Sequence, residues 1–354
     1  MDFTAKHTPL RMTTLAALMV LPSLGQAAKV DPNLSDVQLA KQLAPIMQFH
    51  PEEKHFPTSI EYFYKHSVLK DKNGNILRSY PQSPDQFAHL ATNSDDYLDL
   101  DDNARNVSYS AQAPLYAHVV RYNKNGTDYR EVQYTMLFAY NDCEMFRAFT
   151  YKWVWDSSTK TNFAWCNFGR HEGDWEHASV RINAKTGEVT DVYTNAHGKQ
   201  SRHAPKDISW NGNRPKIYIA QNAHGTHPSS DIFSYATVID SDWSWASSGV
   251  TPAGLRELKV VDVTDDGGIS WDTQNVVQLL NDHPITNYTG RWGLLNMDNT
   301  NVKMPSRNIP HVNDDHMEAV GQAIMKYTKL LNDYKVGTGP RGSWTTGWWD
   351  GEDN

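Results

Sequence analysis

Two stretches of alternating apolar and polar residues, each containing a tight-turn sequence, constrain most strongly how this chain can fold. In the first, Tyr116–Tyr122 is followed by Asn125-Gly126 and then by Arg130–Tyr140. Asn-Gly accepts the left-handed backbone of a two-residue turn, and alternation suits strands that bury one face. The second stretch repeats this order with Trp175–Ile182, the turn Lys185-Thr186-Gly187, and Val189–Asn195. The sequence therefore predicts two antiparallel β-hairpins.

Further short strands are predicted along the chain, at Lys216–Gln221, Ile232–Ile239 and Leu258–Val263. Short strands at such spacing favour an antiparallel sandwich over a parallel sheet with crossover helices. The fold class that we expect is therefore mainly β (α+β): an antiparallel β-sandwich with peripheral helices.

A helical pattern, in which apolar residues recur every three or four positions, occurs in two places. Residues 35–44 are predicted to form a short helix that Ser35 caps and Pro45 ends. Its buried stripe is expected to consist of Val37, Ala40 and Leu43. A longer C-terminal helix is predicted near residues 314–332, packed on the sandwich.

Between and after these elements the pattern is weaker. Residues 70–112 are polar and turn-rich and are predicted to form a long surface excursion. The Gly- and Trp-rich stretch 336–354 has no period and is predicted to be a loosely held tail. Because no linker or repeat interrupts the chain, residues 28–335 are expected to form a single elaborated domain.

The first 27 residues have the features of a targeting sequence. Two basic residues, Lys6 and Arg11, precede an apolar run of about a dozen residues. The run ends at Pro22, and Gly25 and Ala27 are small residues of the kind found before a cleavage site. We therefore predict a cleavable signal peptide over residues 1–27 and a secreted or periplasmic protein; an N-terminal core helix is the alternative.

Composition excludes several classes of protein. Thirty-three basic residues against 41 acidic ones give a net charge of −8, which argues against a general nucleic-acid binder. No apolar run approaches the roughly 18 residues of a membrane-spanning helix. The two cysteines, Cys143 and Cys166, are too few for a disulfide scaffold or a Cys-rich zinc module. Because export would permit it, we predict a disulfide between them.

The densest group of polar residues is the string RHEGDWEH at residues 170–177. Asp174 and Glu176 are two positions apart on a predicted strand, so both carboxylates project from one face. Gly173 would let a turn fold His171 back toward that face. Two carboxylates this close repel each other unless a cation or a proton lies between them. A divalent cation, Mg or Ca rather than Zn, is one solution; an exposed, charged start of a strand is the alternative.

Other polar residues are candidates to orient metal ligands or to contact a bound molecule. His197, His224 and His227 each follow a predicted strand, and strands that end together bring such turns to one rim. His197 and His224 are also the candidates for a general base, if the protein is a metal-dependent hydrolase. Glu172 and His177, inside the charged string, are further candidates for supporting residues or ligands.

With this string and its flanks, the sequence resembles two related families. RHEGDWEHASVRI, then VYTNAHGKQ, then RPKIYIAQNAHGTHPS are similar, in this order, to blocks of the necrosis- and ethylene-inducing peptide-like cytolysins, whose hallmark is Gly-His-Arg-His-Asp-Trp-Glu. LAPIMQFHPEEKHFPTSIEYF, NYTGRWG and GPRGSW resemble instead the vacuolar protein sorting-associated protein 62 family. The resemblance covers most of residues 43–343 and is densest over 134–230.

The cytolysin resemblance implies a β-sandwich, similar to actinoporins and fungal lectins, with a divalent cation on its rim. It implies that the metal ligands are His171, Asp174 and Glu176, with a further ligand from the preceding strand at Asn141 or Asp142. This sequence departs from the hallmark at three positions, which hold Arg170, Glu172 and Gly173. The implied metal ligands survive those changes; the cytolysins' recognition of a glycosylated sphingolipid is not carried over.

Three functions are therefore open from the sequence. The first is a secreted, metal-binding protein or cytolysin that binds a glycan or a lipid headgroup, with a glycolipid membrane surface as the expected partner. The second is a metal-dependent hydrolase. The third is a non-catalytic, lectin-like binding module with a structural ion.

Overall fold

The structure, a computed structural model, describes residues 29–79, 93–151, 158–165, 170–239, 255–294 and 339–351. Strands predominate over helices in these residues, which confirms the predicted mainly β fold class. The predicted signal peptide (1–27) and C-terminal helix (314–332) lie outside the described residues. Of the helices that the structure describes, none is long and apolar enough to cross a membrane.

The largest sheet is built around the two predicted hairpins. Its strands are β2 (Pro57–Thr58), β6 (Leu115–Lys124), β7 (Thr127–Asn141), β10 (His171–Asn183), β11 (Val189–Ala196), β12 (Lys199–His203) and β19 (Val277–Leu279). They run in the order β12-β11-β10-β7-β6-β19, with β2 paired to one end of β7. Asn125 and Gly126 have φ angles of 52° and 80° in the turn between β6 and β7. Both hairpins are antiparallel, as the turn sequences predict.

A second sheet packs on one face of the first and completes the sandwich. Its strands are β1 (Ile46–Phe49), β13 (Trp210–Asn211), β14 (Arg214–Ile219), β15 (Thr226–His227) and β18 (Ser270–Asp272). The core between the two sheets is formed by buried apolar side chains, among them Phe49, Ile217, Trp271, Val132, Phe138 and Val180. Strands β1 and β14 run parallel, so the sandwich is mainly but not wholly antiparallel.

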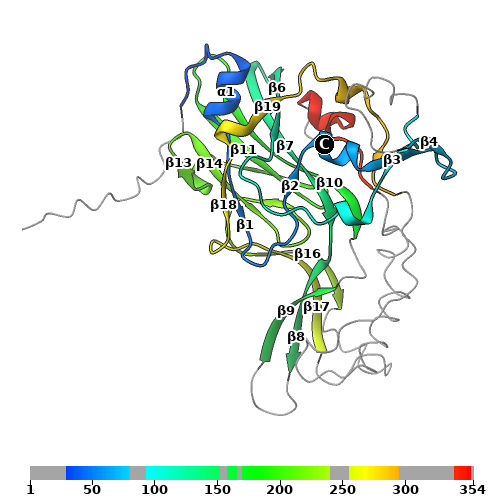
Figure 1. Ribbon diagram of the computed structural model, residues 1–354. Coiled ribbons are helices and arrows are strands. Elements are labelled where there is room, and N and C mark those ends of the chain that lie inside the picture. The colour runs from blue at the N-terminus through cyan, green and yellow to red at the C-terminus, as the bar shows by residue number, and fades with distance from the viewer. Residues whose placement is uncertain are drawn as a thin grey trace, which may run out of the picture.

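A third sheet extends from the body as an arm, in which Figure 1 shows β8, β9 and β17 below the main sheet. Its strands are β8 (Glu144–Tyr151), β9 (Ser158–Trp165), β16 (Ile232–Ile239) and β17 (Leu255–Val263). Cys143, directly before β8, is buried and disulfide-bonded. The other cysteine, Cys166, lies outside the described residues, so the pairing of the two stays a prediction.

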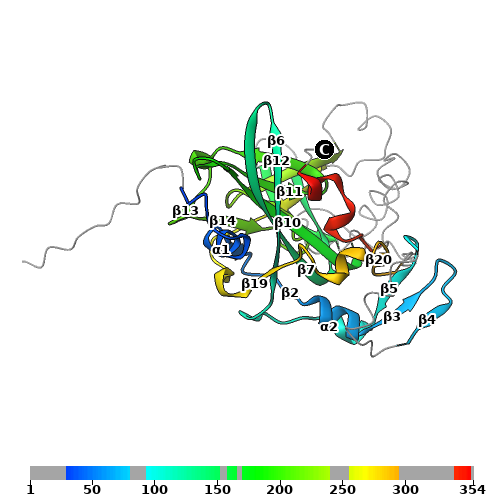
Figure 2. The ribbon, with the colours of Figure 1, turned by 90° about the horizontal axis from the view of Figure 1, so that it is seen from above.

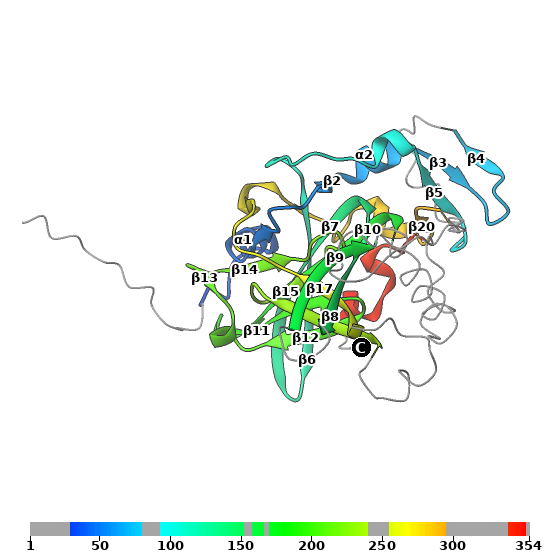
Figure 3. The ribbon, with the colours of Figure 1, turned by 90° about the horizontal axis from the view of Figure 1, so that it is seen from below.

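The surface excursion predicted over residues 70–112 is mostly exposed where the structure describes it, but it also contributes strands to a small sheet, which the prediction did not include. The strands are β3 (Ser67–Lys70), β4 (Ile76–Arg78), β5 (Tyr97–Leu100) and β20 (Arg291–Trp292). Figure 3 shows them together with helix α2 (Ile60–Lys65) at one end of the molecule. Leu98 and Leu100 are buried in a second apolar cluster with Trp292. The sequence did not reveal this sheet because its strands are only two to four residues long, too short to show a clear alternation.

The predicted N-terminal helix forms as α1 (Asp36–Gln42). The Ser35 side chain accepts a hydrogen bond from the backbone N–H of Gln38, as expected of its cap. Val37 was misplaced, since it is 47% exposed, and Leu39 is buried instead beside Ala40. Short 3-10 helices lie at Asp102–Ala104, Pro205–Asp207, Gln274–Val276, Pro284–Asn287, Ser343–Thr345 and Gly347–Asp350.

The C-terminal tail is not loosely held where the structure describes it. Residues 339–351, which we call the C-terminal strap, lie against the main sheet beside β10 and β20 (Figure 2, red). Trp344 and Trp348 are buried, and the indole N–H of Trp344 donates to the carbonyl oxygen of Tyr288 at 2.7 Å. Burial of two indoles stabilises this attachment by roughly 2–3 kcal/mol each before the entropy of ordering is subtracted. The tryptophans of this segment, which follow no helical or strand period in the sequence, therefore serve to pack it against the main sheet.

Candidate functional site

Strand β10 directs its carboxylates and its large rings to opposite faces of the sheet. Asp174 and Glu176 lie opposite Phe138 and Met136 on β7, and both partners belong to the sandwich core. Trp175 belongs instead to the second apolar cluster, on the other face. The alternation of a strand thus places both carboxylates on one face, at the rim of the sandwich.

The turn predicted at His171 is absent, because β10 already begins at this residue and pairs it with Asn141 of β7. A left-handed Gly173 inside the strand, with φ 60°, orients the ring instead. Nδ1 of His171 lies 2.8 Å from the carbonyl oxygen of Gly173, so it must carry the proton. That leaves Nε2 as the acceptor, 3.1 Å from Nδ2 of Asn141.

His224 organises the acidic side of the rim. Its Nδ1 lies 2.9 Å from Oδ2 of Asp174, its Nε2 lies 3.6 Å from Oε1 of Glu53, and its ring stacks on Phe138 at 3.8 Å. Burial opposes the charge of this imidazole, but Glu53 and Asp174 outweigh burial and raise the pKa of His224 to about 9. A histidine that holds its proton at neutral pH cannot accept another, so the predicted role of general base does not fit His224.

Two further histidines share one buried carboxylate. Nε2 of His197 lies 2.8 Å from Oδ1 of Asp262, and Nε2 of His227 lies 2.8 Å from Oδ2. Burial lowers the pKa of His197, but the charges of Asp262 and Glu144 overcome this and raise it to about 9. His197 is therefore also protonated at neutral pH and is no better placed as a general base.

Glu176 is the carboxylate that this arrangement leaves uncompensated. Burial, followed by the charges of Asp174, Asp262 and Glu144, raises the pKa of Glu176 well above its usual range. Its side chain accepts no hydrogen bond from another of the described residues. Four carboxylates thus repel one another at a point where the histidine protons are already committed to other partners.

The turns around this rim are held in a strained backbone conformation. His197, Asn222 and His224 have φ angles of 51°, 63° and 57°, in the left-handed region. Non-glycine residues adopt it at a cost of roughly 1–2 kcal/mol, which the surrounding contacts must offset. Here the backbone N–H of Asn222 donates to Glu53 at 2.8 Å. Strain of this kind clusters at functional sites, which supports this rim as the site.

Two predicted site residues serve other purposes. Glu172 accepts hydrogen bonds from Nε of Arg105 and from the backbone N–H of Leu100, both at 3.0 Å, and so attaches the small sheet to β10. His177 lies on the opposite face of β10, with its ring centroid 4.4 Å from that of Trp348. Burial there lowers the pKa of His177 to about 4. Neither side chain is turned toward the carboxylates of the rim.

The structure separates the two alternatives that the sequence left for the fourth ligand. Asp142 is paired with Arg170 at 3.2 Å and lies 3.8 Å from Nε2 of His55. Asn141 instead faces His171, and the oxygen and nitrogen of its amide can exchange places. Asn141 is therefore the better candidate.

Sequence reasoning missed three acidic residues of the rim, which are Glu53, Glu144 and Asp262. Glu53 lies in the string HPEEKHFP, and Asp262 is the penultimate residue of β17, so the only local signals were acids at strand ends. Among the described residues, no three His, Cys, Asp or Glu side chains are arranged as a ready coordination sphere. The imidazoles point instead at carboxylates and an amide.

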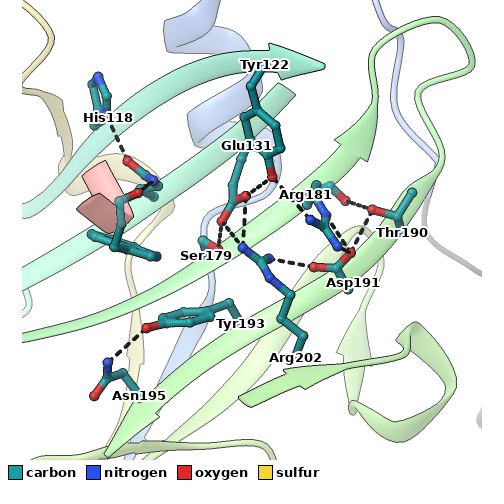
Figure 4. A network of polar contacts seen from close by, with 12 residues as sticks. His118, Tyr122, Glu131, Ser179, Arg181, Thr190, Asp191, Tyr193, Asn195 and Arg202 are labelled. Atoms are coloured by element: carbon teal, nitrogen blue, oxygen red, sulfur yellow. Dashed lines mark hydrogen bonds and ion pairs between the residues drawn. The ribbon is translucent and has the colours of Figure 1, made fainter. Parts of the chain in front are cut away.

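A second polar network, on the opposite face of the main sheet, differs from the rim in its charge balance (Figure 4). Glu131 accepts hydrogen bonds from Tyr122, Ser179 and Arg202, while Asp191 pairs with Arg181 and Arg202. Two guanidinium groups thus match two carboxylates. Such a network is fully satisfied and gives no reason to expect a ligand.

A family model described as vacuolar protein sorting-associated protein 62 matches residues 3–294. The chain belongs to this family. Similar solved structures include NLPPya in complex with mannosamine, at 14% identity over 84% of this chain and 96% of that one, with a TM-score of 0.33. The non-toxic HaNLP3 protein is 12% identical over 76% of this chain and 86% of its own, with a TM-score of 0.31. No curated protein matches the sequence.

Replacing Gly173 by alanine should destabilise the protein more than the same change at Gly126. Both glycines are left-handed, with φ 60° and 80°, so both variants carry the backbone cost of roughly 1–2 kcal/mol. A Cβ at Gly173 would also lie 2.3 Å from the carbonyl oxygen of Trp292, whereas Gly126 has nothing within 4 Å. Urea unfolding should therefore show an additional loss of about 1–3 kcal/mol for Gly173→Ala. Equal losses of unfolding free energy in the two variants would show that β20 can move away from the new Cβ without destabilising the protein.

The ion pair of His197 with Asp262 predicts a loss of stability at alkaline pH. Because the pKa of His197 in the folded protein, about 9, exceeds the 6.5 of an ordinary histidine, the contribution of this ion pair is complete below pH 6.5 and disappears as pH rises through 9. The free energy of unfolding in chelator should fall over this range by on the order of 3 kcal/mol more in wild type than in His197→Gln. His203→Gln is the control, because burial shifts the pKa of His203 in the opposite direction, below the usual histidine value. A wild-type slope in His197→Gln would contradict the assignment.

Proposed function

We propose that the protein is an exported, divalent-cation-dependent binding protein that recognises a glycan or a lipid headgroup at the acidic rim. The observation that carries this proposal is the gathering of Asp174, Asp262 and Glu144 around Glu176, whose pKa burial and these charges together raise. A divalent cation would relieve that repulsion without a proton. Export is supported by the N-terminal sequence and by the disulfide at Cys143, since disulfides persist in oxidising compartments.

The residues that would hold the ion are His171, Asn141, Asp174 and Glu176. Nε2 of His171 is the available nitrogen, since Nδ1 is held by the carbonyl of Gly173, an arrangement typical of histidine ligands. Oxygen predominates in this set, which suits Mg²⁺ or Ca²⁺ better than Zn²⁺. The bound ion would offer open coordination positions to a hydroxyl or an anionic oxygen of the ligand.

Binding is favoured over hydrolysis because the rim lacks a suitable base in the positions predicted for one. The carboxylates beside His197 and His224 raise the pKa of each to about 9, so both are acids at neutral pH. Their fixed positive charges instead reduce the repulsion between carboxylates while the cation is absent. A non-catalytic, lectin-like role would use the same site and would differ only in that ligand binding is not followed by membrane damage.

Glu176→Gln should change the sign of its effect when cation is added. In chelator at pH 7.5 the variant should be as stable as wild type or more so, because the amide removes a charge that its neighbours oppose. With Ca²⁺ or Mg²⁺ at a hundredfold excess over Kd, wild type should gain about 2.7 kcal/mol that the variant largely lacks. Thermal unfolding and calorimetric titration measure both effects.

Asp142→Asn is the matched control for Glu176→Gln, because Asp142 is a nearby carboxylate already paired with Arg170. It should leave the cation affinity within about twofold of wild type. The metal assignment is wrong if chelator leaves wild type unaffected, or if Glu176→Gln behaves identically with and without cation.

The ligand class predicts binding that depends on the cation. The first probes are glucosamine and mannosamine, because solved structures of NLPPya contain these sugars. Vesicles that contain a glycosylated sphingolipid are the second. Binding should be lost in chelator and in Glu176→Gln, and retained in Asp142→Asn. Vesicle leakage would add a cytolytic outcome, and turnover in a panel of esters and glycosides would favour the hydrolase; binding that persists in chelator would refute the proposal.

A further inference from the structure

The two residues that flank Glu176 on β10 are both held from the opposite face by the C-terminal strap. Trp175 meets the ring of Trp344 edge to face, with centroids 5.3 Å apart at 76°. His177 lies against Trp348, with centroids 4.4 Å apart. Because neighbouring residues of a strand point to opposite faces, fixing 175 and 177 also fixes the direction of the carboxylate between them.

A chain of buried hydroxyl groups links the strap to the backbone of Glu176. Oγ1 of Thr135 lies 3.3 Å from the carbonyl oxygen of Glu176 and 2.8 Å from Oγ of Ser343. When Thr135 donates to the carbonyl, Ser343 donates to Thr135. Thr135 and Ser343 are 0% and 5% exposed, so little water competes for these bonds. The strap is therefore linked through Thr135 to the backbone of β10, in addition to the ring contacts that it makes with Trp175 and His177.

The strap is anchored independently of β10. Pro340 accepts a hydrogen bond from the backbone N–H of Trp292 at 2.8 Å, and Trp349 stacks on His118 of β6 at 4.0 Å. Gln133 of β7 donates to the carbonyl oxygen of Trp348. These contacts lie along the same sheet face as the network of Figure 4, which includes His118. An element held by β6, β7 and β20 can act as a rigid support behind β10.

We propose that Ser343, Trp344 and Trp348 are positioning residues for the cation site, which they keep in shape from the reverse face of the sheet. The proposal rests on the function proposed above. Asp174 and Glu176 repel each other, so an unsupported strand end relieves the repulsion by turning one carboxylate away. The strap opposes that movement and keeps the carboxylate of Glu176 on the rim face, so that fewer groups have to be reoriented when the ion binds.

The test compares Trp348→Ala with Trp349→Ala in the full chain. Both changes remove an indole from the strap, but Trp349 packs on β6 rather than on β10. We expect Trp348→Ala to weaken Ca²⁺ or Mg²⁺ binding by about tenfold, as loss of an orienting residue commonly does. In chelator, the amides of residues 174–178 should exchange faster with solvent. Trp348→Phe should restore most of the affinity, and Trp349→Ala should stay within about twofold of wild type.

Ser343→Ala removes a single hydroxyl and serves as the second variant if Trp348→Ala does not fold; we expect an affinity loss of about fivefold. The positioning role is overturned if Trp348→Ala and Trp349→Ala lose cation affinity in the same proportion to their loss of Tm. It is also overturned if amide exchange at residues 174–178 is the same in Trp348→Ala as in wild type. Unchanged affinity in Trp348→Ala, with wild type binding the ion, overturns the strap's role alone. A wild-type protein that binds neither ion overturns the proposed function and this role with it.

Discussion

Repulsion between neighbouring carboxylates at the rim is the constraint on which the rest of the site depends. Asp174 is relieved by its bond to His224, and Asp262 by its bond to His197, at distances of 2.9 and 2.8 Å. Both imidazoles are stacked on aromatic rings, which fixes them beside the carboxylates they already neutralise. Glu176 has no such partner among the described residues, and burial together with the charges of Asp174, Asp262 and Glu144 raises its pKa. Only a proton or a cation from solution can supply the missing positive charge.

The three departures from the cytolysin hallmark have structural reasons. Arg170 pairs with the carboxylate that follows β7, and Glu172 binds Arg105 and so attaches the small sheet. Gly173 accepts the close approach of Trp292, where any Cβ would meet a carbonyl oxygen. These residues hold segments that pack around β10. They change the surroundings of the proposed ligand positions without replacing His171 or the two carboxylates, so cation binding and ligand choice can diverge independently.

The sequence was sufficient where the determining interactions are local. The hairpin at Asn125-Gly126 and the helix capped by Ser35 depend on residues within a few positions of one another. Glu53 reaches His224, and Asp262 acts on Glu176, only through the packing of distant segments, so no spacing in the sequence could identify them. The strap was missed for the same reason: its rings follow no period, because the surface that buries them comes from β7, β10 and β20. Strands β3, β4 and β5, in and beside the described part of residues 70–112, were missed because each is only three or four residues long, too short to show a clear alternation.

The two polar networks of the main sheet allow a comparison within one molecule. On the strap face, Glu131 and Asp191 are matched by Arg181 and Arg202, whose guanidinium groups keep their charge at any physiological pH (Figure 4). A fold that can build such a balanced network has no structural need for an unbalanced one, since an uncompensated buried charge reduces stability. At the rim the counter-charges are histidines, and they are fewer than the carboxylates around them. This excess of carboxylates lowers stability, and it occurs at a rim that has strained turns and a support behind it. Such an arrangement is expected where a ligand supplies the missing positive charge.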